Sequence, residues 1–231
     1  MISIAHIEET AKKLRKRIWG MRWDLWPGQK HDSRWVLDPE LAAIAMGLQY
    51  EYRDDLGTIG VGRHEQRVAG CFLRNEGRIL VSEKNGYVAQ RFTGAHEIGH
   101  ALLHSQRSDM YFHRDRPIFG LGGSEQGRSP IEREADRFAA AFLVPPQYLR
   151  KQFGARFGME QLVFDEHVAF WLSPSDPSAL VLAKAGTLDR LRAIASATSF
   201  EGRHFDSLAS QFDVSVDTMA LRLRELGLVY E

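Results

Sequence analysis

The chain has 231 residues, of which 44% are hydrophobic and 26% charged, and this length allows one large domain or one domain with a small appendage. Thirty basic residues balance thirty acidic ones, so composition provides no general attraction to nucleic acid or to a membrane surface. The single cysteine, Cys71, excludes an intrachain disulfide and fits a reducing compartment. Because neither a signal-peptide pattern nor an apolar run of about 18 residues occurs, we expect a cytoplasmic protein without a membrane partner.

The sequence patterns of the N-terminal part predict helices followed by strands. Apolar residues recur at helical spacing over residues 3–19. Asp38 and Pro39 are typical of a helix start, and Gly47 of a helix end, so a second helix is expected between them. Three strand-like runs follow at residues 48–53, 68–73 and 78–82, with a hairpin turn expected at 75–77.

The remaining chain is predicted to be mainly helical. The two clearest helices cover residues 92–104 and 131–144, with a long Gly-rich loop at 105–131 between them. Two shorter helices are expected at 205–212 and 215–226. We therefore predict an α+β chain with a first domain at residues 1–155 and a C-terminal helical module at 156–231.

The first of the two clearest helices contains an HExxH pattern formed by His96, Glu97 and His100. Positions i and i+4 of a helix are about 400° apart in rotation, so both imidazoles leave the same face, one turn apart. Two nitrogens placed in this way can bind one metal ion, and Glu97 can take a proton from water on its open side. Gly99 costs about 1 kcal/mol relative to Ala inside a helix, which suggests that another element approaches closely there.

The second clear helix carries acidic residues that are candidates for a third metal ligand and for a partner of a liganding histidine. Glu132 and Asp136 are also at i and i+4 and share a face, so Glu132 can be the third ligand and Asp136 can accept the remaining ring N–H of a liganding histidine. Glu134 lies about 200° from Glu132 around the helix and is not expected to act with Asp136. An acidic helix start that stabilises the helix dipole is the simpler alternative.

Three blocks of sequence resemble the ImmA/IrrE family of metallopeptidases. They are residues 91–104 around the HExxH pattern, residues 132–145 with the small run 139–141, and a tail of residues 208–228. The resemblance implies a compact zincin-like fold, with a small mixed sheet, the HExxH helix, a second ligand-bearing helix and a helix-turn-helix-like tail. It also implies that His96, His100 and Glu132 are metal ligands and that Glu97 is the general base.

The same resemblance implies a substrate class. Family members commonly cleave a helix-turn-helix transcriptional repressor in the bacterial or phage cytoplasm, and so take part in stress responses and transcription regulation. Residues 201–231 of this chain carry three basic and six acidic side chains. Because DNA binding depends mainly on Lys and Arg, we interpret the tail as a packing or protein-docking module and expect no direct contact with nucleic acid.

The expected chemistry is zinc-dependent hydrolysis of a peptide bond, of gluzincin type, with Mn²⁺ as the alternative ion. A strand at 78–83 is expected to lie at a sheet edge, where an extended substrate can pair with it. A donor to the oxyanion is also expected. The candidates for this donor are Arg91, His104, Tyr111, His113 and Tyr148.

Two other functions remain open from the residues alone. One is a hydrolase of deformylase type that uses Cys71 as a ligand; the position of the Glu132 block disfavours it. The other is a non-catalytic binding or sensing module that keeps zinc for structure. Glu97 disfavours that function, because a purely structural site needs no base.

Overall fold

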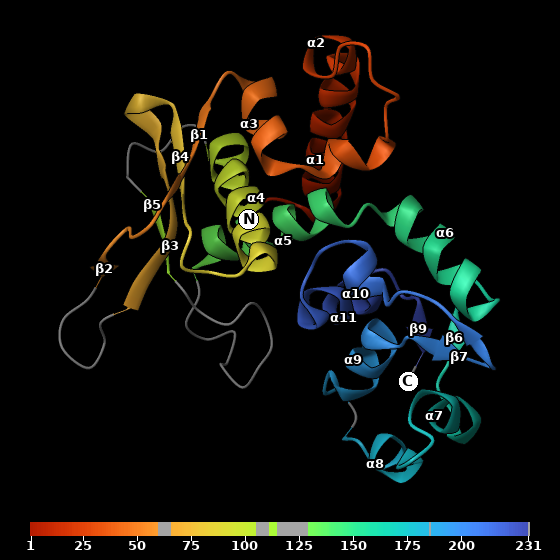
Figure 1. The fold of residues 1–231 in the computed structure, drawn as a ribbon. Coiled ribbons are helices and arrows are strands. Elements are labelled where there is room, and N and C mark those ends of the chain that lie inside the picture. The colour runs from red at the N-terminus through yellow and green to blue at the C-terminus, as the bar shows by residue number, and fades with distance from the viewer. Residues whose placement is uncertain (60–65, 105–110, 115–128, 185, 231) are drawn as a thin grey trace. The chain divides into compact units, whose positions relative to one another are not determined.

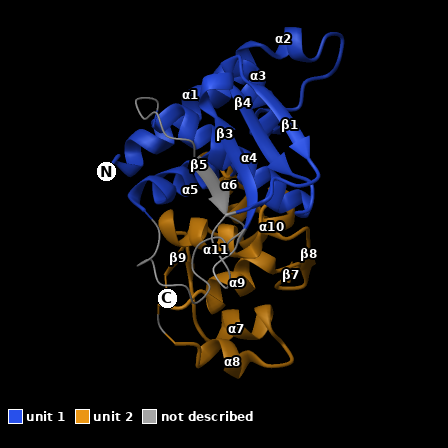
Figure 2. Ribbon diagram, turned by 90° about the vertical axis from the view of Figure 1, so that its left-hand side faces the viewer, with its two compact units in different colours: residues 1–116, 127–143 blue, residues 117–126, 144–231 orange. Residues whose placement is uncertain are grey.

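The computed structural model describes residues 1–59, 66–104, 111–114, 129–184 and 186–230. These residues form two compact units (Figure 2). Unit 1 holds the described residues of 1–116 and 127–143, and unit 2 holds those from Val144 onward. Helices and small sheets occur in both units, which fits the expected α+β class and is compatible with a zincin-like fold.

Unit 1 contains a five-stranded sheet. Its strands are β1 (Gln49–Arg53), β2 (Thr58–Ile59), β3 (Gln66–Leu73), β4 (Arg78–Ser82) and β5 (Tyr111–Arg114). The order is β1-β4-β3-β2, with β5 also paired to β3. The strand prediction at 48–53, 68–73 and 78–82 is thus confirmed, whereas β5 lies inside the segment expected to be a loop. The other residues of that expected loop up to residue 128 lie outside the described residues.

The expectation that residues 78–83 form an edge strand is wrong. β4 pairs in parallel with β1 and antiparallel with β3, so both of its hydrogen-bonding edges are occupied. The reason is topological: β1 enters the sheet beside β4 although β4 is closer to β3 in the chain. An extended substrate therefore cannot pair with β4.

The helical elements of unit 1 follow local signals that are visible in the sequence. They are α1 (Ile4–Gly20), α2 (Arg22–Leu25), η1 (Ser33–Leu37), α3 (Pro39–Met46), η3 (Arg74–Glu76), α4 (Tyr87–Leu103) and α5 (Pro130–Leu143). The α3 prediction is confirmed, because the Asp38 carboxylate accepts hydrogen bonds from the first backbone amides and Gly47 ends the helix with φ 76°.

Helix α4 is the centre of unit 1. It packs against β3 and β4 on one side and against α5 on another, while α1 packs on α5 and α3 (Figure 1). Every residue of α4 from Phe92 to His100 is buried. The HExxH pattern therefore lies in the core between the sheet and α5, not on a surface helix.

Unit 2 is built from short elements. They are α6 (Pro146–Phe157), β6 (Leu162–Val163), α7 (Glu166–Leu172), α8 (Pro177–Val181), α9 (Asp189–Ser196), β7 (Ser199–Phe200), β8 (Arg203–His204), α10 (Leu208–Gln211), α11 (Val216–Glu225) and β9 (Val229–Tyr230). The helix expected at 205–212 begins later, at Leu208, because residues 199–204 form the β7–β8 hairpin and Ser207 caps α10.

Packing also assigns α6 to unit 2. Phe157 contacts the ring of Phe200, and the Arg156 guanidinium donates to the backbone oxygen of Asp206. The compact units therefore divide between Leu143 and Val144, whereas the sequence led us to expect a first domain extending to residue 155.

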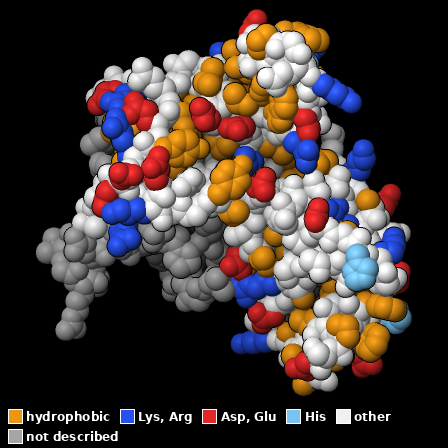
Figure 3. All heavy atoms as spheres, in the orientation of Figure 1, with side chains coloured by type: hydrophobic (Ala, Val, Ile, Leu, Met, Phe, Trp, Pro, Cys, Tyr) orange, Lys and Arg blue, Asp and Glu red, His pale blue; other side chains and the backbone are white. Residues whose placement is uncertain are grey.

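The surface carries charges of both signs. On the face drawn in Figure 3, acidic and basic side chains of the described residues are interspersed. Among the helices that the structure describes, none has both the length and the apolar character that crossing a membrane requires.

Candidate metal centre

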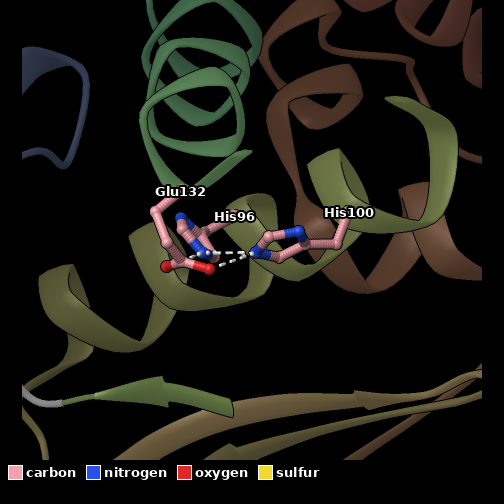
Figure 4. A group of neighbouring side chains, drawn as sticks. All are labelled: His96, His100 and Glu132. Atoms are coloured by element: carbon pink, nitrogen blue, oxygen red, sulfur yellow. Dashed lines mark hydrogen bonds and ion pairs between the residues drawn. The ribbon is translucent and has the colours of Figure 1, made fainter. Parts of the chain in front are cut away.

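Two adjacent helices bring three predicted ligand side chains together. His96 and His100 leave the same face of α4, and Glu132 reaches them from the first turn of α5 (Figure 4). The start of α5 is set by Ser129, whose side-chain oxygen accepts from the backbone N–H of Glu132. The two imidazoles are fully buried, whereas the Glu132 side chain is 24% exposed, so the cluster has its solvent-facing side at Glu132.

The spacing of the three groups matches a single small cation. The Nε2 atoms of the two histidines are 2.9 Å apart, and the Glu132 carboxylate oxygens lie 3.4 Å from His96 Nε2 and 3.3 Å from His100 Nε2. Ligands held at about 2.0–2.1 Å from one ion in tetrahedral geometry are separated from each other by about 3.3 Å. Among the described residues, these three form the group of histidine, cysteine and acidic side chains whose ligand atoms converge.

Burial controls the charge of this cluster. Desolvation lowers the pKa of His100 to about 4, although the Glu132 carboxylate opposes the shift. The imidazole is therefore neutral near pH 7, which is the form that binds a metal ion.

Glu97 lies beside the cluster in an unusual environment. Burial raises the pKa of its carboxyl to about 8; a positively charged His96 lowers it, and the negative charge of Glu132 raises it further. The backbone amide of Phe72 favours the ionised form but lies outside ordinary hydrogen-bonding geometry, so neither carboxyl oxygen has a hydrogen-bond partner within the described part of the chain. A buried carboxyl without a partner is costly, and a nearby cation or a bound water would relieve that cost.

Asp136 lies where the sequence predicted an outer partner. Its Oδ1 atom is 2.9 Å from Nδ1 of His96, and both groups are buried. A carboxylate only accepts hydrogen bonds, so Nδ1 of His96 carries the proton and its Nε2 lone pair points toward His100 and Glu132. The chemistry of this donor set fits a divalent cation.

A comparison with protein families shows which family the chain belongs to. The family described as the IrrE N-terminal-like domain, Peptidase_M78, matches residues 55–171, which is half of the chain. The chain belongs to the ImmA/IrrE family of metallopeptidases. The matched region contains both α4 and α5, and membership supports metallopeptidase activity in general terms. A search of curated proteins found no match.

One acidic residue of this ImmA/IrrE chain has contacts that the sequence did not predict. Glu134 is buried, and its Oε2 atom is 3.0 Å from Nε2 of His104. The other ring nitrogen of His104, Nδ1, is 3.1 Å from Nδ1 of His100. Helical geometry correctly separates Glu134 from Glu132 and Asp136, but the sequence gives no signal that His104 connects Glu134 to the site. Both nitrogens of His104, a candidate oxyanion donor, are thus engaged behind His100.

The other candidate donors of the ImmA/IrrE chain lie in different surroundings. The guanidinium of Arg91 donates to the backbone oxygen of Leu37 and so faces η1. Tyr148 belongs to unit 2, where its ring packs on Phe212. The backbones of Tyr111 and His113 pair with β3 opposite Phe72 and Gly70; their side chains lie outside the described residues.

Cys71 is not part of the converging group. It is buried in β3 at 3% exposure, and burial raises the pKa of its thiol to about 11. A thiol must lose its proton to bind zinc, so this environment disfavours Cys71 as a ligand.

Proposed function

We propose that this chain is a zinc-dependent endopeptidase of gluzincin type that cleaves a protein substrate in the cytoplasm, with Mn²⁺ as the alternative ion. The observation that carries the proposal is the convergence of His96, His100 and Glu132 next to the carboxyl of Glu97, which has no hydrogen-bond partner among the described residues. Family membership supports the same class of activity.

The three converging side chains would hold the ion. A bound Zn²⁺ would act as a Lewis acid toward the scissile carbonyl and would lower the pKa of a water molecule toward 7. Together with a bound divalent ion, two neutral imidazole ligands and one carboxylate would give the site a net positive charge, and the partial exposure of Glu132 provides solvent access. A structural zinc site is normally closed by four protein ligands, so the three ligands that converge within the described residues favour a catalytic role over a purely structural one.

The Glu97 carboxylate would accept the proton of the attacking water at one of its oxygen atoms and later deliver it to the leaving amine. Its buried position suits this role, because a raised pKa brings a carboxyl closer to the pH at which it must both accept and donate. The positive charge of a bound ion would favour the ionised form that starts the cycle.

We propose a helix-turn-helix transcriptional repressor as the substrate, because the sequence blocks resemble those of repressor-cleaving relatives. The C-terminal helices α10 and α11 would then serve as a packing or docking module and not as a DNA reader. The excess of acidic over basic residues at 201–231 supports this assignment.

The test is a cleavage assay with purified protein and candidate repressors encoded next to it, with and without a chelator. We expect two defined fragments by mass spectrometry, loss of cleavage with the chelator, and recovery when Zn²⁺ is restored. The Glu97→Gln variant should bind zinc but lose at least about 100-fold in rate, since general-base catalysis contributes about 10²–10⁴-fold. Glu40→Gln, which changes an exposed glutamate on α3, is the matched control. Full cleavage by the Glu97→Gln variant would refute the assigned base.

A further inference from the structure

His104 and Glu134 form a buried chain of contacts that ends at His100. His104 follows the last residue of α4, and its backbone oxygen accepts from the guanidinium of Arg74 at 3.1 Å, so this helix end is held in place. His104 and Glu134 are both buried, with 7% and 6% of the respective residue exposed. Little water can therefore compete for their hydrogen bonds. Contacts of this kind can determine which nitrogen of an imidazole carries its proton.

The direction of each hydrogen bond follows from the acid at the end of the chain. The Glu134 carboxylate can only accept, and its Oε1 atom already accepts from the backbone N–H of Ile2 at 2.6 Å. Its Oε2 atom therefore accepts from His104, whose proton is then on Nε2. A neutral imidazole carries one N–H, so Nδ1 of His104 is an acceptor.

The same reasoning determines which ring nitrogen of His100 carries the proton. Its Nδ1 atom faces the Nδ1 acceptor of His104 at 3.1 Å, so the proton of His100 is on Nδ1. The Nε2 atom of His100 then presents a lone pair toward His96 and Glu132. The opposite tautomer would place an N–H where the cation is expected.

We propose that Glu134 and His104 form a hydrogen-bond relay that holds His100 in its Nδ1–H tautomer and so presents Nε2 to a divalent cation. This inference rests on the proposed metal site. His104 and Glu134 are positioning residues: they act through His100, as Asp136 acts directly on His96. Each imidazole thus has its own carboxylate on α5, one in direct contact and one through His104.

Glu134→Gln is the informative variant, because glutamine has one acceptor oxygen where the relay needs two. If the amide oxygen stays with Ile2, the amide N–H₂ faces His104 and favours the opposite tautomer of both His104 and His100. We expect a loss of about 10–100-fold in Zn²⁺ affinity, as is typical for outer partners of metal ligands. Zinc affinity is measured by titration of the metal-free full chain against a competing chelator, with Glu40→Gln as the matched control.

A second measurement detects the effect of the relay on the histidine tautomers in the metal-free protein. Long-range ¹H–¹⁵N correlation spectra of the ¹⁵N-histidine-labelled, metal-free protein distinguish the two tautomers of a neutral imidazole. We expect the Nδ1–H form for His100 in the wild type and in Glu40→Gln, and a population of the Nε2–H form in Glu134→Gln. The His104→Phe variant should also lose zinc affinity, and His104→Asn should recover part of it because its amide oxygen restores an acceptor.

The outcomes separate this inference from the proposed function. Unchanged zinc affinity together with an unchanged His100 tautomer in Glu134→Gln overturns the relay, even if the wild type cleaves its substrate. A wild type that binds zinc but cleaves no repressor contradicts the proposed substrate and leaves the relay supported by the tautomer and affinity data. Should the wild-type spectrum show His100 in the Nε2–H form, the relay is refuted directly.

Discussion

Gly99 on α4 lies so close to Ala135 on α5 that a Cβ atom at position 99 would be 3.2 Å from the Ala135 Cα atom. The same Cβ would be 3.2 Å from two atoms of the Phe138 side chain. The close approach inferred from Gly99 in the sequence is thus confirmed. It matters for the site because α4 carries the two histidines and α5 carries Glu132.

We predict that Gly99→Ala destabilises the protein by about 1–3 kcal/mol, because the added methyl group forces two packed helices apart. This loss should exceed the gain of about 1 kcal/mol that alanine normally brings inside a helix. Urea unfolding of the metal-free protein measures the change. Gly20→Ala at the end of α1 is the control: nothing lies within 4 Å of its added Cβ, so it should be neutral or mildly stabilising. Equal stability of Gly99→Ala and wild type would contradict the packing argument.

Removing the direct partner of His96 should weaken metal binding. We predict that Asp136→Ala loses about 10–100-fold in Zn²⁺ affinity, because Nδ1 of His96 is no longer held as the donor. Competition with a chelator measures this loss. The control is Asp38→Ala, which removes the N-cap of α3 and should cost about 1 kcal/mol of stability without changing zinc affinity. An equal effect of the two variants on zinc affinity would count against a specific role for Asp136.

The lone cysteine should be dispensable for metal binding. We predict that Cys71→Ser keeps wild-type zinc affinity, because the thiol is buried in β3 outside the converging group. It should lose about 1–3 kcal/mol of stability, since the new hydroxyl is buried among apolar groups. Zinc content after dialysis and thermal unfolding report the two effects separately. Loss of the metal in this variant would instead support the deformylase-type alternative, in which Cys71 is a ligand.

The buried Glu97 should make the stability of the metal-free protein depend on pH. Its pKa is raised to about 8 in the folded state and is near 4.5 without perturbation, so the folded state binds the extra proton between these values. This contribution to stability is complete below about pH 4.5 and is lost as pH rises through 8. Glu97→Gln should therefore stabilise the metal-free protein at pH 8 by on the order of 4 kcal/mol, with little effect at pH 4 to 5. Denaturant unfolding at the two pH values measures it, and a gain independent of pH would disprove the assignment.

His100 shows the opposite dependence. Its pKa is lowered to about 4 from 6.5, so the stability that it contributes is present above pH 6.5 and is lost as pH falls through 4. We predict that the wild-type metal-free protein loses stability over this acidic range, and that His100→Gln, which cannot take up a proton there, loses less. Unfolding midpoints at pH 7 and pH 5 compare the two. A parallel loss in both proteins would assign the acid sensitivity to other groups.

Local signals were sufficient for several elements. Capping residues and apolar spacing predicted α3 and α1, and the run of apolar residues predicted β4, because these features depend on neighbours in the chain. Sheet order was different. That β4 is an interior strand depends on its pairing with both β1 and β3, which no local pattern encodes.

The sequence by itself determined which residues share a helical face. An HExxH pattern must place His96 and His100 together, and four-residue spacing must place Glu132 with Asp136, because the period of the α-helix leaves no other arrangement. Only the tertiary structure decided which side chains of α5 meet which histidine. Glu134 reaches His104 because the packing of α4 on α5 and the position of Ile2 bring three distant segments together, and contacts between distant segments follow from packing, not from helical period.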